Sequence, residues 1–175
     1  MAETSKGDDT RSEELEERVV SPGSDSADLS SAVAVAGHPI HAMSVHFPIA
    51  LVIATFGVDL FYWWTADPFW VRVGIWSAGF AFATGVFAGF VGTLELLFVS
   101  GIRMRAASWA HGVAAMLLIA IAGANWLVRI TIDDAVLPHG LLLSGLATIV
   151  TGLAGWHGGK LIFDHGIGLM VGAKD

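Results

Sequence analysis

Four long apolar segments constrain this chain more than any other feature of its sequence. They lie at about residues 42–64, 69–100, 108–129 and 139–158, and short polar connections separate them. Each has at least the roughly 20 residues that an α-helix needs to cross the hydrocarbon core of a bilayer, and the second is long enough to tilt or project. Because backbone groups in lipid must find hydrogen bonds within the protein, such segments fold as helices. The sequence therefore predicts an all-α integral membrane protein with four transmembrane helices.

The composition supports this class of protein. Hydrophobic residues make up 54% of the 175 residues and charged residues 14%, with a mean hydropathy of +0.66. A soluble domain usually carries about 25% charged residues. The chain has no cysteine, so it forms no disulfide and offers no thiolate ligand to a metal or an iron–sulfur cluster. It also has no basic cluster to neutralise phosphates, and we expect the lipid bilayer rather than a nucleic acid as its surroundings.

The first 36 residues differ in character from the rest. They are rich in Glu, Asp, Ser and Gly and contain little to bury, so we expect a disordered acidic tail over residues 1–36. Residues 37–175 then form a four-helix membrane domain. The short connections favour an up-down-up-down bundle, because consecutive helices with short loops pack as antiparallel neighbours.

The distribution of basic residues predicts the orientation of this bundle. We call side A the end where the first helix begins and the second helix ends; the opposite end is side B. Arg103, Arg105 and Lys160 lie on side A, whereas Arg72 and Arg129 lie on side B with several acidic residues. By the positive-inside rule, side A and both termini are expected in the cytoplasm. Ridges of small residues on the second and fourth segments leave room for a homo-oligomer.

Six of the seven histidines fall on side A. Three lie in the stretch GHPIHAMSVHFP from Gly37 to Pro48, and the others lie at the start of the third segment, at the end of the fourth and just beyond it: His38, His41, His46, His111, His157 and His165. Glu95, near the end of the second segment, lies at the same depth. Neutral imidazole is the commonest metal ligand, and the interior of a helix bundle is a standard place for a cofactor. The cluster therefore predicts a cofactor site at this end of the bundle.

The residue pattern leaves three interpretations of this cluster open. Histidines on two helices at equal depth suit the axial positions of haem b, with His46 and His111 as the best pair and His41 and Glu95 as groups that tune it or relay protons. A directly bound zinc or non-haem iron would instead use mixed ligands drawn from His38, His41, His46, His111, Glu95 and His165. Alternatively no cofactor binds, and these side chains only join helices in a structural or anchoring subunit. No catalytic residue is assigned, because no nucleophile–base pair or phosphate loop is present.

Two further features of the sequence concern the bundle as a whole. His46 lies 49 residues before Glu95, and His111 lies 46 residues before His157, which suggests a duplicated helical hairpin. Asp59 falls in the side B half of the first segment. We expect it to cap a helix or to pair with an arginine of side B.

Three motifs resemble one known family. HPIHAMSVHFPIAL, the SWAHG around His111 and the closing GWHGGKLIFDHGIGL resemble bacterial membrane proteins catalogued as domain of unknown function 2231, which have four predicted membrane helices. The resemblance covers about residues 37–171 and puts five of the histidines at motif positions, namely His38, His41, His46, His111 and His165. His157 departs from the motif. The Rieske-type and sugar-dehydrogenase-like partners of some relatives imply a redox role. By that resemblance we expect an electron-transfer or accessory subunit of the bacterial inner membrane, working with a quinone or a partner dehydrogenase, rather than a stand-alone enzyme.

Overall fold

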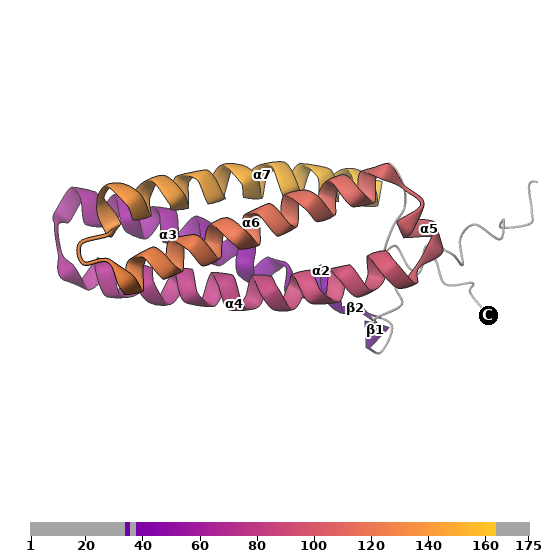
Figure 1. The fold of residues 1–175 in the computed structure, drawn as a ribbon, viewed down its shortest axis with the longest axis horizontal. Coiled ribbons are helices and arrows are strands. Elements are labelled where there is room, and N and C mark those ends of the chain that lie inside the picture. The colour runs from indigo at the N-terminus through magenta and orange to yellow at the C-terminus, as the bar shows by residue number, and fades with distance from the viewer. Residues whose placement is uncertain (1–33, 36–37, 164–175) are drawn as a thin grey trace, which may run out of the picture.

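The computed structural model describes residues 34–35 and 38–163, and within them the chain forms the predicted bundle of four long helices. Figure 1 shows these helices side by side along the long axis of the molecule. The first span consists of α2 (Ile40–Ser44) and α3 (His46–Thr65), and the second is α4 (Pro68–Phe98). The third is α6 (Ala106–Thr131), and the fourth consists of the π-helical turn η2 (Val136–Gly140) and α7 (Leu141–Phe163). All four spans are long and apolar enough to cross a membrane.

The ends of the helices differ from the predicted bounds by a few residues. The first, third and fourth spans are longer than expected, whereas α4 ends at Phe98 rather than at residue 100, and the one-turn helix α5 (Ser100–Arg103) follows it. Before the bundle, β1 (Ala34–Val35) pairs antiparallel with β2 (His38–Pro39). The predicted disordered tail falls almost entirely outside the described residues.

The turn between α3 and α4 shows why the first hairpin closes so tightly. Ala66 adopts a left-handed conformation with φ of 52°, and its N–H bonds to the carbonyl of Tyr62. The Asp67 carboxylate then accepts the N–H of Phe69 at 2.8 Å, which caps α4, and Pro68 occupies the first helical position, where no N–H is needed. This turn and the α6–α7 connection lie at side B, and α5 lies at side A (Figure 1).

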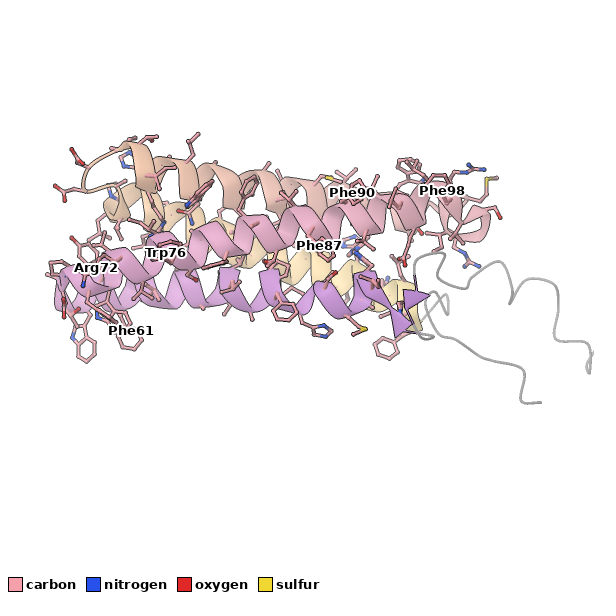
Figure 2. The ribbon with its side chains drawn as sticks, turned by 90° about the horizontal axis from the view of Figure 1, so that it is seen from below. Phe61, Arg72, Trp76, Phe87, Phe90 and Phe98 are labelled. Atoms are coloured by element: carbon pink, nitrogen blue, oxygen red, sulfur yellow. The ribbon has the colours of Figure 1, made fainter. Side chains whose placement is uncertain are left out.

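The packing places small residues inside and large apolar residues outside. The most deeply buried residues of α4 and α7 include Ala78, Ala81 and Ala147. Along α4, by contrast, Trp76, Phe87, Phe90 and Phe98 are each more than half exposed, and Figure 2 shows them following one another from the end near Arg72. Small residues let helix backbones approach closely, and lipid tails solvate the outer aromatic groups. The bundle is therefore built to be surrounded by lipid.

The helices form a ring in which α3 and α6 are diagonal. Both α3 and α6 pack chiefly against α4 and α7. Any direct contact between a side chain of the first span and one of the third must therefore cross the centre of the bundle. Among the described residues, a pair of imidazoles and an ion pair make such contacts, one near each end of the bundle.

Candidate functional site

The first of these contacts joins His41 and His111 at side A. His41 lies in α2, immediately after Pro39 ends the extended β2, and His111 lies in the second turn of α6. The centres of their rings are 6.4 Å apart, and the ring planes are nearly perpendicular at 80°. Because the two residues come from diagonally opposite spans, their rings meet in the interior of the bundle.

A backbone carbonyl orients each of the two rings. His41 Nδ1 lies 2.9 Å from the carbonyl oxygen of Ala88, and His111 Nδ1 lies 3.1 Å from that of Ala154. A carbonyl oxygen can only accept, so Nδ1 carries the proton and donates it in both bonds. This tautomer leaves the Nε2 lone pair as the free electron donor. Metal-ligating histidines are typically held in this way by a partner on the second nitrogen.

Glycines make room for both imidazole rings. A Cβ atom on Gly92 would lie 2.6 Å from Cε1 of His41, and a Cβ atom on Gly158 would lie 3.2 Å from Cε1 of His111. In each case the glycine is four residues beyond the carbonyl that holds the ring. The histidines therefore occupy space that a side chain on α4 or α7 would otherwise fill.

Of the other predicted site residues, His46 lies apart from this pair. His46, expected to be the partner of His111, is exposed at the start of α3, and its Nδ1 lies 3.2 Å from the carbonyl of Met43 in its own span. Five residues separate His46 from His41, which turns a helix by about 140°, so the two point to different sides. Glu95 is buried near the end of α4. The His38 side chain and His165 lie outside the described part of the chain.

A directly bound metal ion finds few ligands in this arrangement. Within the described residues no group of three or more His, Asp or Glu side chains could hold a metal ion. His157, for example, bonds through Nδ1 to the carbonyl of Leu153 on its own helix at 2.9 Å. The ring contact that the structure shows at side A is the one between the imidazoles of His41 and His111.

The second diagonal contact is a buried ion pair at side B. Arg129 Nη2 donates to Asp59 Oδ2 at 2.6 Å, and each side chain is only 1% exposed. Ser144 donates to the same carboxylate oxygen at 2.6 Å, and Arg129 Nε donates to Asn125 Oδ1 at 2.9 Å. The other carboxylate oxygen and Arg129 Nη1 have no hydrogen-bond partner within the described residues, which adds to the cost of burial.

This cluster answers the question about Asp59 that the sequence left open. Its partner is Arg129 rather than a helix end. The roles of Asn125 and Ser144 were not predicted. The i, i+4 spacing of Asn125 and Arg129 on one helix face was the signal that could have indicated the first of them. Charged residues inside a membrane bundle are rare and normally paired, as they are here.

Comparison with known proteins gives one match. The model of a family described as "Predicted membrane protein (DUF2231)" matches residues 37–170. No curated protein and no solved structure gives a significant match. The resemblance found in the three sequence motifs is thereby confirmed.

Proposed function

The chain belongs to the DUF2231 family of predicted membrane proteins, and from that premise we propose that it is a redox subunit that holds one haem b between His41 and His111. The observation that carries the proposal is the pair of carbonyl-oriented imidazoles in edge contact inside the bundle. The quinone pool or a partner dehydrogenase would exchange electrons with it. By the charge distribution, side A would face the cytoplasm of a bacterial inner membrane.

The separation of the two rings would let one bound metal take both as ligands. Imidazole nitrogens bind metals at about 2 Å, so the centres of two rings on one ion lie roughly 5 to 6.5 Å apart, depending on the angle between the bonds. The observed 6.4 Å falls within that range.

The number of donors favours a haem over a directly bound ion. Structural zinc sites use four protein ligands and catalytic zinc sites three. A haem supplies four nitrogens of its own, so two histidines complete its coordination. The described residues offer two histidines in contact, which fits a haem better than a directly bound ion.

The surrounding residues have definite tasks in this proposal. The carbonyls of Ala88 and Ala154 hold the tautomer that presents Nε2, and a hydrogen bond of this kind also raises the basicity of a ligand. Gly92 and Gly158 let the rings lie against α4 and α7. The bound haem would supply one-electron chemistry, and the burial and hydrogen bonding of its ligands would set the potential.

Optical spectroscopy on histidine variants tests this function. Detergent-purified protein, produced with added haem, is expected to show a Soret band, and sharp α and β bands after reduction. His41→Ala and His111→Ala should each lose these bands. The matched controls His46→Ala and His157→Ala, on the same side of the membrane, should keep them.

A colourless protein after haem supplementation, or loss of the bands in His46→Ala but not in His41→Ala, would contradict the proposal. Metal analysis of that colourless protein then tests the alternative of a directly bound ion.

A further inference from the structure

The two diagonal contacts are separated by the same distance along both helices. Eighteen residues separate His41 from Asp59, and eighteen separate His111 from Arg129. Adding 70 to a residue number of the first span therefore gives the equivalent position in the third span. This shift also places Val52 on Ala122 and Thr55 on Asn125, and all four of these residues are buried.

The second and fourth spans match in the same way, with a shift of 66 residues. Of the seven buried residues of α4, six fall on a buried residue of η2 or α7. The six pairs are Gly74 with Gly140, Ala78 with Ser144, Ala81 with Ala147, Gly85 with Thr151, Ala88 with Ala154, and Glu95 with Leu161. The two shifts differ by four residues because α3 continues six residues past Asp59, whereas α6 ends two residues past Arg129.

The contacts themselves repeat under these shifts. The carbonyls of Ala88 and Ala154 are equivalent, and so are Gly92 and Gly158, which accommodate the two histidine rings. A small cavity of about 10 Å³ lies in the bundle interior, and its eight lining residues form four equivalent pairs. The contacts, the burial and the cavity lining thus repeat under the same two shifts, which is the pattern expected of parallel repeats in a membrane protein.

We infer that the chain consists of two tandem copies of one helical hairpin, and that the Asp59–Arg129 pair specifies how the two copies associate. The equivalence corrects the pairing suggested by the sequence, because the counterpart of His111 is His41 rather than His46. The inference goes beyond the proposed function, because it concerns how the two hairpins associate. It depends on the proposed function only for the identity of the group that the histidines bind.

The position of the ion pair explains why it would select one association. Asp59 and Arg129 are equivalent positions, so two identical hairpins would bring two carboxylates or two guanidinium groups together near the axis. Like charges in a buried site repel strongly, whereas the observed opposite charges attract. Buried ionic groups are poor evidence for stability, but fixing the register between helices is their best-attested use.

Two glycines show how closely the bundle packs around the guanidinium group of Arg129. A Cβ atom on Gly74 would lie 2.6 Å from Nη1, and one on the equivalent Gly140 would lie 2.9 Å from Nη2. The guanidinium group is therefore enclosed by equivalent residues of both hairpins. Eighteen residues span about 27 Å of helix, and sliding α6 by one turn would move both layers by about 5 Å. The ion pair at side B thus sets the height at which His111 meets His41 at side A.

Cross-linking in the full chain tests this inference without any cofactor. Because the chain has no cysteine, His41→Cys with His111→Cys introduces the only two thiols, and a short bifunctional thiol reagent should join them. Adding Asp59→Arg or Arg129→Asp should reduce the cross-linking yield to roughly a tenth, because the buried charge loses its partner. The same charge reversal at Asp133, exposed in the α6–α7 connection, serves as the matched control and should leave the yield unchanged.

Exchanging the two environments distinguishes the repeat from an ordinary ion pair. The combination Asp59→Arg, Arg129→Asp, Thr55→Asn, Asn125→Thr, Ala78→Ser and Ser144→Ala moves the whole cluster to its equivalent positions. It should restore the cross-link, and the neutral pair Asp59→Asn with Arg129→Gln should remain helical with a reduced yield. The inference would be overturned if the parent did not cross-link or if the single charge reversals cross-linked normally. It would also be overturned if the exchanged variant cross-linked no better than the single reversals, or if the neutral pair gave the full yield. None of these variants contains the two histidines, so the cross-linking result does not depend on haem binding. The optical test uses the native histidines and does not depend on the cross-linking result.

Discussion

Asp59 and Arg129 meet at 2.6 Å across the diagonal of a four-helix membrane bundle, with Ser144 bound to the same carboxylate oxygen. The contact lies at the end of the bundle opposite to the His41–His111 pair. One layer carries charge and the other carries imidazoles, and apolar and small residues fill the space between them. A side chain substituted in one layer therefore does not touch the other layer.

Removing one member of the ion pair is expected to destabilise the protein strongly. Asp59→Ala or Arg129→Ala leaves an uncompensated buried charge, which costs about 3–5 kcal/mol. The double variant Asp59→Leu with Arg129→Met should be far closer to the parent, because both charges are then removed. Reversible unfolding followed by tryptophan fluorescence measures the differences. The control Arg72→Met, on an exposed side chain, should change stability by no more than about 0.5 kcal/mol. Equal losses in Arg129→Ala and Arg72→Met would contradict this view of the pair.

The hydroxyl of Ser144 contributes to the same cluster. Ser144→Ala removes a 2.6 Å hydrogen bond to a carboxylate that is fully buried. Hydrogen bonds to charged groups are worth about 1.5–3 kcal/mol, and the loss of stability should fall in that range. Thr148→Ala is a suitable comparison, because its hydroxyl bonds only to the carbonyl of Ser144 on the same helix. The same unfolding assay should show a clearly smaller loss for Thr148→Ala.

Glycine substitutions beside the histidines should act in a graded order. Gly92→Ala places a Cβ atom 2.6 Å from the His41 ring, whereas Gly158→Ala places one 3.2 Å from the His111 ring. We expect overpacking of about 1–3 kcal/mol for the first and less for the second. Haem content per protein, read from the Soret band, should fall in the same order. Gly152→Ala is the control, since nothing lies within 4 Å of its added Cβ atom. A larger effect at Gly152 than at Gly92 would show that packing against the ring is not the cause.

Thiol labelling in cells tests the predicted orientation. The connections at the two ends carry exposed residues, Met104 at side A and Asp133 at side B. If side A is cytoplasmic, Met104→Cys should resist a membrane-impermeant thiol reagent until the membrane is opened, and Asp133→Cys should react at once. The cysteine-free parent is the blank. The reverse labelling pattern would place the histidine pair on the outer side of the membrane.

The sequence was sufficient to establish the class of protein and the number of spans. Long apolar segments in lipid have no alternative to helices, and short connections leave few ways to arrange four of them. The expectation that histidines gather at side A also came from counting crossings. None of these conclusions depends on how a helix is rotated about its own axis.

Which side chains meet was decided only by the tertiary structure. His41 and His46 are five residues apart in one span, and the sequence favoured His46 because it lies deeper in the predicted helix. The structure turns His41 inward onto Gly92 and leaves His46 exposed. Asp59 likewise had two arginines within reach by depth, and Arg129 was selected because α3 and α6 face each other across the diagonal. The periodicity of a lipid-facing helix says little about its rotation, because apolar residues cover both its inner and outer faces. Rotation is set by the close packing of small residues on neighbouring helices, and that packing exists only in the folded bundle.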